Sequence, residues 1–190
     1  QNRLNVTVRE PDASPLQLQG PLAPKVAQKL FGDVAIEMGY YHFTHLSLSE
    51  IPVVLSRTGW SGELGYEIIL LDRNRGTELW DLCMSAGEEY NIQPACPSLA
   101  RSVEGGMLSY CSDITNADNP FTVGMERLLD IDKPQNYIGK EALQRIAISG
   151  PERRLVGANF SGVPVTPNEE FLDVYHRGSV VGHITRCVYS

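Results

Sequence analysis

One carboxylate, Glu67, lies inside an otherwise apolar segment and directly follows an aromatic residue. Strand alternation puts Glu67 on the same face as Ile69 and Leu71, and puts Tyr66 on the opposite face. Both faces are mainly apolar, so we expect both to be covered, with Glu67 in a core or in the wall of a cavity. A covered carboxylate needs hydrogen-bond donors. Two interpretations are open: the protein or solvent supplies these donors, as for most strand carboxylates, or a ligand does.

The segment before Glu67 is rich in glycine. Gly59, Gly62 and Gly65 separate two apolar runs, residues 51–55 and 66–71. Glycine supplies the positive φ that tight or bulged hairpin connections require. The pattern therefore predicts a β-hairpin whose second strand carries the carboxylate.

The elements around this hairpin predict a sheet with helices. Strands are predicted at residues 4–8, 40–48, 51–58 and 65–71, and helices at residues 21–31 and 75–87. In both helices apolar residues share one face, and a glycine ends the pattern. The order strand, helix, strands, helix is typical of an α+β fold with a ferredoxin-like antiparallel sheet and flanking helices.

The C-terminal part of the sequence has a different pattern. Short helices are predicted after Ser98, a suitable N-cap, and at residues 139–146. Beyond Gly150 and Pro151 come short β segments, separated by Gly, Pro and Asn: residues 155–160, 172–175 and 180–185. We therefore expect two domains, residues 1–150 and a small β domain at 151–190.

Composition narrows the classes of partner. The chain has 190 residues, a net charge of −7 and a sequence pI near 5.1, which argues against a nucleic-acid surface. It contains no apolar run of the roughly 18 residues that would span a membrane, and no signal peptide opens it. The four cysteines and four histidines show no metal-ligand spacing. We expect a cytoplasmic protein with reduced thiols and no metal, membrane or nucleic-acid partner.

Five ordered motifs resemble one family. Residues 59–68, Gly-Trp-Ser-Gly-Glu-Leu-Gly-Tyr-Glu-Ile, are similar to the signature of the folate-dependent aminomethyltransferases, which include the glycine-cleavage T-protein. The other matches, in chain order, are residues 16–21, 98–107, 137–143 and the strand motifs at 154–157 and 182–185. Together they cover nearly the whole chain, which is identified as a member of this family.

The resemblance implies a tetrahydrofolate site. In the family, the last acidic residue of the signature binds the pterin ring, and here that residue is Glu67. A carboxylate can accept two parallel N–H bonds from a 2-aminopyrimidinone edge. Tyr66 and Arg101 are the further predicted folate contacts. When the chain is aligned on Glu104, Arg101 is offset by one residue from the family's arginine, which is about 100° of helix rotation.

Three segments of the sequence are similar to the dimethylsulfoniopropionate demethylase branch of the family: residues 11–21, 104–110 and 118–120. Those enzymes move a methyl group from a sulfonium to tetrahydrofolate. The implied second partner is therefore a small methyl or aminomethyl donor, a sulfonium or an amine. Trp60 has two interpretations: it packs the hairpin, or it holds the cationic donor over its indole face.

The resemblance also concerns where the chain starts and stops. The chain begins where the family's middle begins and ends inside the family's C-terminal β-barrel. We therefore expect a fragment that lacks the N-terminal region and full catalytic competence, with a truncated barrel at residues 151–190. A truncated gene product and a short paralogue both fit this expectation.

Two alternatives to a transferase are open. One is a non-catalytic folate-binding relative of the iron–sulfur assembly type, although residues 133–141 lack the cysteine of that group's motif. The other is a structural or interaction protein without a ligand. In that case an unfinished sheet edge would favour self-association into a homo-oligomer.

Overall fold

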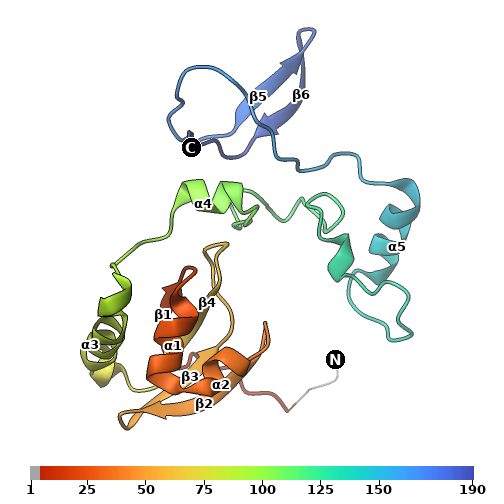
Figure 1. The fold of residues 1–190 in the computed structure, drawn as a ribbon. Helices are drawn as coiled ribbons and strands as arrows, with labels where there is room; N and C mark the ends of the chain where they lie inside the picture. The colour runs from red at the N-terminus through yellow and green to blue at the C-terminus, as the bar shows by residue number, and fades with distance from the viewer. Residues whose placement is uncertain (1–4) are drawn as a thin grey trace. The chain divides into compact units, whose positions relative to one another are not determined.

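The chain forms two compact units, one ending at Arg101 and one beginning at Ser102. The structure, a computed structural model, describes residues 5–190 (Figure 1). The division predicted after residue 150 stays a prediction.

The N-terminal unit is built on a four-stranded sheet. Its strands are β1 (Ser14–Gln19), β2 (Phe43–Leu48), β3 (Ile51–Ser56) and β4 (Gly65–Leu70). Their order is β1-β4-β3-β2, and all neighbours are antiparallel. The strands predicted at residues 40–48, 51–58 and 65–71 are confirmed with somewhat shorter bounds.

The strand predicted at residues 4–8 is wrong for the part that the structure describes. Val6 and Val8 belong to no strand and are 66% and 92% exposed, while Leu4 lies outside the described residues. The outer partner of β4 is β1, where Leu16 and Leu18 pack toward the core. Alternation shows which residues would share a face, but not whether a partner strand lies beside them.

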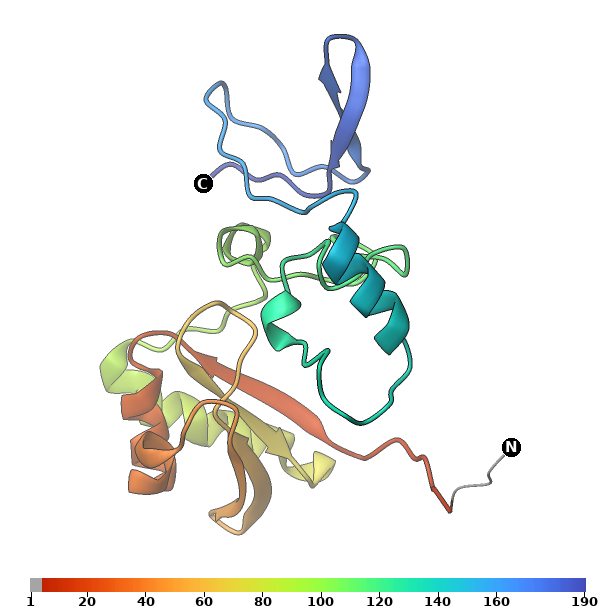
Figure 2. The same cartoon turned by 90° about the vertical axis from the view of Figure 1, so that its right-hand side faces the viewer.

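Three helices accompany the sheet: α1 (Ala23–Phe31), α2 (Asp33–Glu37) and α3 (Gly76–Gly87). Figure 2 shows α1 and α3 on the same side of the sheet. Apolar side chains of these helices and of the strands form one buried core. The largest fully buried members are Tyr66, Ile51, Leu55, Ile68, Leu79 and Val53. The helices predicted at residues 21–31 and 75–87 are confirmed.

The other face of the sheet is open. A row of side chains crosses it from Gln17 through Glu67 and Ser56 to Phe43, as the strand register places them. Glu67 and Ser56 are half-buried, and Phe43 is 66% exposed. Tyr66, on the inner face, is 1% exposed. The expectation that both faces are covered is therefore wrong, because the strand neighbours of Glu67 are mainly polar.

The C-terminal unit holds few regular elements. Helix α4 (Leu99–Glu104) runs across the division between the units, and α5 (Lys140–Ser149) follows a long irregular stretch. Both helices were predicted. Residues 155–160 form no strand, so that prediction is wrong. The backbone N–H of Leu155 instead donates to the carbonyl oxygen of Thr122 at 2.7 Å.

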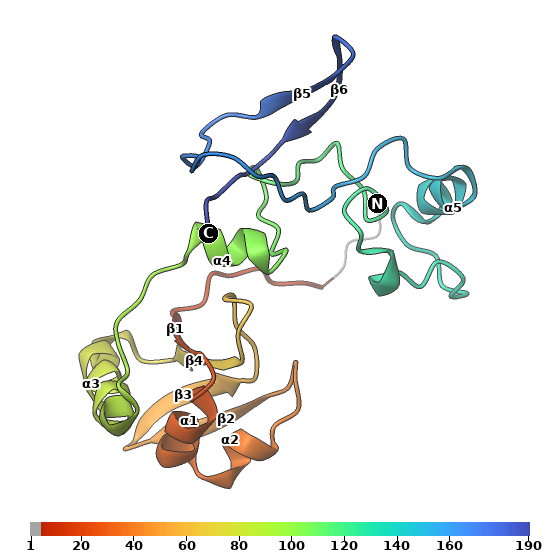
Figure 3. The same cartoon turned by 45° about the horizontal axis from the view of Figure 1, so that its top comes forward.

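The remaining strands of this unit form a hairpin. Strands β5 (Leu172–His176) and β6 (Ser179–Ile184) pair antiparallel, with an irregularity between Val174 and Tyr175 (Figure 3). Within residues 5–190 this two-stranded sheet gains no further strand, and no closed barrel is found. An α+β fold with an antiparallel sheet and flanking helices is thus confirmed, whereas the ferredoxin-like arrangement and the truncated barrel stay predictions.

Candidate functional site

Glu67 is held by a hydroxyl from the hairpin connection. The Thr58 hydroxyl donates a hydrogen bond to Oε2 of Glu67. The hydroxyl oxygens of Ser56 and Thr58 lie 2.7 Å apart. Because Thr58 has one hydroxyl proton and gives it to the carboxylate, Ser56 must be the donor of the second bond. The result is a directed relay from Ser56 through Thr58 to Glu67.

This arrangement leaves the carboxylate able to accept more hydrogen bonds. Within residues 5–190, Thr58 is the donor that the structure shows for Glu67. A carboxylate offers about four lone-pair sites. Glu67 is half-buried on the open face of the sheet, so the unused sites are accessible to a ligand. Its chemistry is that of an oriented acceptor for N–H donors.

The Gln19 side chain fixes the path of the connection. Its Nε2 donates to the carbonyl oxygens of Tyr66 (3.1 Å) and Thr58 (3.5 Å), and its Oε1 accepts from the Ser61 hydroxyl (2.6 Å). A Cβ atom added to Gly59 or Gly65 would lie 2.2 or 2.3 Å from this amide.

Two of the three hairpin glycines are therefore needed for space rather than for φ. Gly62 has a φ of 73°, as the hairpin pattern predicts. Gly59 and Gly65 do not adopt a positive φ, and that part of the prediction is wrong. The absence of their side chains makes room for Gln19.

Tyr66 lies behind β4, on the face opposite to Glu67. Its hydroxyl donates to the carbonyl oxygen of Ala35 at 3.0 Å, and its ring lies 5.0 Å from the guanidinium carbon of Arg57. Burial raises the pKa of the Tyr66 phenol, and the nearby Arg57 opposes that shift. The structure does not bring Tyr66 together with Glu67, since the strand lies between the two side chains.

Arg101 and Trp60 are both associated with the hairpin connection. The Arg101 guanidinium forms an ion pair with Glu63 at 2.6 Å, and both side chains are substantially exposed. Trp60 is 44% exposed. The structure thus places Arg101 near the predicted segment, but bonded to Glu63 rather than to Glu67.

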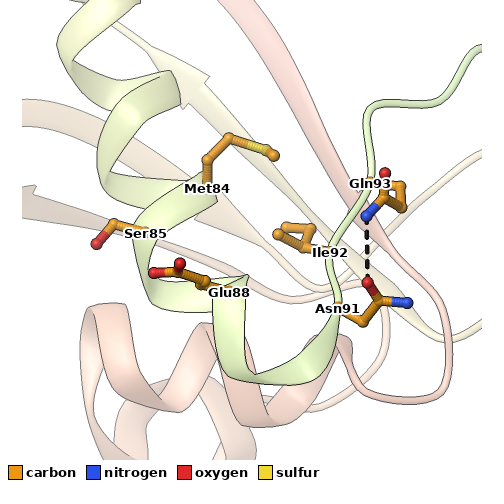
Figure 4. Close-up of a pocket in the computed structure, with 6 residues that line it drawn as sticks. All are labelled: Met84, Ser85, Glu88, Asn91, Ile92 and Gln93. Carbon is orange, nitrogen blue, oxygen red and sulfur yellow. Dashed lines mark hydrogen bonds between the residues drawn. The ribbon is translucent and has the colours of Figure 1, made fainter.

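One pocket lies elsewhere in this unit. It has a volume of about 410 Å³ and lies where α3 ends and the chain turns back (Figure 4). Its lining residues are Met84, Ser85, Glu88, Asn91, Ile92 and Gln93. None of the predicted site residues lines it. The candidate site at Glu67 is an open surface and not an enclosed cavity. The hydrogen bonds of Glu67 are what identify it as a candidate site.

In the C-terminal unit, Arg186 forms a polar cluster that sequence patterns do not indicate. Its guanidinium bonds both oxygens of Asp113, at 2.6 and 2.5 Å, and also the Ser102 hydroxyl and the Met107 carbonyl oxygen, each at 2.7 Å. The backbone N–H of Ser109 donates to the same carboxylate at 2.7 Å. These hydrogen-bond and ion-pair partners all belong to the C-terminal unit, so the cluster holds this unit together.

Two classes of site find no support in the described part of the chain. Residues 5–190 contain no group of three or more His, Cys, Asp or Glu side chains that could hold a metal ion. Over the same residues, no helix has both the length and the apolarity to cross a membrane.

Comparison with known proteins decides the family. Residues 1–133 match the GCVT N-terminal domain. The chain belongs to the GCVT family. This is the glycine-cleavage T-protein family that the five motifs indicated, so the predicted membership is confirmed.

The GCVT relatives include two kinds of enzyme. A dimethylsulfoniopropionate demethylase, DmdA, of Ruegeria pomeroyi is 31% identical over 186 residues, which cover 98% of this chain and 50% of the relative. An aminomethyltransferase of Synechococcus is 34% identical over 189 residues, covering 96% and 48%. An aminomethyltransferase of Symbiobacterium thermophilum is 32% identical over 197 residues, covering 100% and 51%. The chain spans about half the length of these curated relatives.

Proposed function

We propose that the chain takes part in tetrahydrofolate-dependent transfer of a one-carbon unit, and that Glu67 recognises the pterin ring. The donor would be a small sulfonium or amine. Membership of the GCVT family supports the reaction class, since the relatives are named as aminomethyltransferases and a demethylase.

The proposal rests on the orientation and the partial exposure of the Glu67 carboxylate. One oxygen is oriented by the Thr58 hydroxyl, and the group lies half-buried on the open sheet face. A pterin presents two adjacent N–H donors on its 2-amino-4-oxo pyrimidine edge. An oriented carboxylate matches that edge with two parallel, charge-assisted hydrogen bonds. A strand carboxylate that only faces water would need no hydrogen bond to orient it.

The other predicted contacts take different roles in this proposal. Tyr66 supports β4 from behind, because its ring is buried and its hydroxyl is bonded to Ala35. Arg101 borders the connection through its ion pair with Glu63. Trp60, exposed in the same connection, is the proposed contact for the cationic donor.

Calorimetric titration tests the pterin role. We expect tetrahydrofolate to bind the wild-type chain, and Glu67→Ala to weaken binding by about tenfold or more, because hydrogen bonds to a charged group are lost. The matched control is Glu63→Ala, which removes an exposed carboxylate from the same connection and should stay within about twofold of wild type. Equal affinity in Glu67→Ala and wild type would contradict the pterin role. A wild-type chain that binds no tetrahydrofolate would contradict the proposal for this chain and favour a structural or interaction role.

A second titration tests the donor site. Trp60→Ala should weaken binding of dimethylsulfoniopropionate by about 0.5–2 kcal/mol, roughly 2- to 30-fold, since the cation would lose its aromatic partner. Trp80→Ala is the matched control, because Trp80 has a similar exposure (43% against 44%) but lies in α3. Equal effects of the two variants would exclude a specific role for Trp60.

A further inference from the structure

We infer that Thr58 is a positioning residue, whose hydroxyl sets the orientation of the Glu67 carboxylate before the ligand arrives. The inference rests on the proposed function, because it concerns the same pterin contact. Thr58 would touch the carboxylate and not the ligand.

The relay of hydrogen bonds has one direction, toward Glu67. Thr58 gives its only hydroxyl proton to Oε2 of Glu67 and receives one from Ser56, whose oxygen is 2.7 Å away. Ser56 and Glu67 are also directly paired across β3 and β4. The three side chains therefore lie on one face of the sheet, with the acceptor at the end of the chain of bonds. A relay in this direction stabilises Glu67 as an acceptor.

Thr58 is itself held in place by hydrogen bonds. Its carbonyl oxygen accepts from Gln19, whose amide also bonds the carbonyl oxygen of Tyr66 at 3.1 Å. Arg57, the preceding residue, donates to the carbonyl oxygen of Gly65 at 2.8 Å. These bonds hold the start of the connection, at Arg57 and Thr58, close to its end, at Gly65 and Tyr66. Threonine is also stiff at χ1, which limits the positions open to its hydroxyl.

The consequence is preorganisation. A glutamate has several rotatable bonds, and a free side chain on an open face would lose that freedom when a ligand binds. A carboxylate already fixed through Thr58 loses less, so the affinity for the pterin edge is higher. Thr58 is thus expected to affect ligand affinity more than it affects folding.

The test compares side chains at position 58 by titration with tetrahydrofolate. Thr58→Val keeps the shape and removes the hydroxyl, and should weaken binding by about tenfold. Thr58→Ser restores the hydroxyl and should return within about twofold of wild type. Thr77→Val, at an exposed threonine of α3, is the control for the substitution and should not change the affinity.

A purely structural role predicts a different pattern. In that case Thr58→Ser would bind as weakly as Thr58→Val, and that result would overturn the inference, as would wild-type affinity in Thr58→Val. Should Thr58→Val fail to fold by circular dichroism, Thr58→Ala and Thr58→Ser form a second pair that differs only in the hydroxyl. The inference then requires Ser to bind at least about fivefold more tightly than Ala.

Titration of the two variants separates the pterin role of Glu67 from the positioning role of Thr58. If Glu67→Ala binds tetrahydrofolate as wild type does, the pterin role fails and the inference fails with it. If Glu67→Ala weakens binding while Thr58→Val does not, the pterin role stands and only the positioning role of Thr58 is wrong.

Discussion

Arg186 and Asp113, 73 residues apart in the sequence, form a two-point ion pair inside the C-terminal unit. Their side chains are 13% and 6% exposed. Arg186→Ala would leave the Asp113 carboxylate without its cation, and breaking one side of a buried pair costs about 3 kcal/mol or more. We expect faster amide hydrogen exchange across residues 102–190, measured by mass spectrometry.

The control for this prediction is Arg154→Ala. Arg154 pairs with Glu126 at 3.2 Å, but the two side chains are 54% and 39% exposed, so the pair contributes at most about 1 kcal/mol. Similar exchange in the two variants would show that the Arg186 cluster does not hold this unit together.

The cost in stability of replacing Gly59 is predicted to depend on Gln19. In Gly59→Ala the new Cβ would lie 2.2 Å from the Gln19 amide, so the flexible amide must move and give up its bonds to Tyr66 and Ser61. We expect a loss of about 1–2 kcal/mol in the free energy of unfolding, measured with urea. In a Gln19→Ala background the same substitution should cost much less, because the three atoms nearest to the new Cβ, all of the Gln19 amide, are absent.

Gly157→Ala is the matched control, since an added Cβ there meets nothing within 4 Å. It should change the free energy of unfolding by less than about 0.5 kcal/mol. A cost for Gly59→Ala that is the same with and without Gln19 would contradict the explanation of this glycine.

The cysteines are predicted to differ in reactivity. Burial raises the pKa of the Cys83 thiol from 9.0 to about 11. The thiolate is the reactive form, so at pH 8 only about one Cys83 in a thousand is reactive, and that fraction grows as the pH rises toward 11. Cys96 and Cys111 are exposed. Iodoacetamide at pH 8 should therefore modify Cys96 and Cys111 long before Cys83, as peptide mass spectrometry would show. Equal rates would mean that Cys83 is not buried in solution.

Local patterns predicted the elements around the site well. The helices and the hairpin strands follow from apolar periodicity and glycine stops, and alternation placed Glu67 and Tyr66 on opposite faces, as the structure has them. No strand was predicted at Ser14–Gln19, although residues 16–21 were matched to a motif of the family. The place of this strand is set by pairing with β4, which is a tertiary effect.

The hydroxyl partners of Glu67 were not predicted, although their spacing in the sequence indicates them. Ser56 and Thr58 are two residues apart, so alternation puts both hydroxyls on one side, and hairpin pairing brings them to Glu67. Nothing comparable indicates Arg186 and Asp113, whose contact depends on how a long irregular chain folds back. Contacts within one hairpin can be derived from spacing, whereas contacts across 73 residues cannot.

The most direct test of the central claim is a crystal structure of the chain with tetrahydrofolate. We expect the 2-amino group and the neighbouring ring N–H of the pterin to lie about 2.7–3.1 Å from the Glu67 carboxylate oxygens. We also expect Thr58 to keep its bond to Oε2. A pterin bound elsewhere, for instance in the pocket where α3 ends, with Glu67 bonded to Thr58 alone, would contradict the claim.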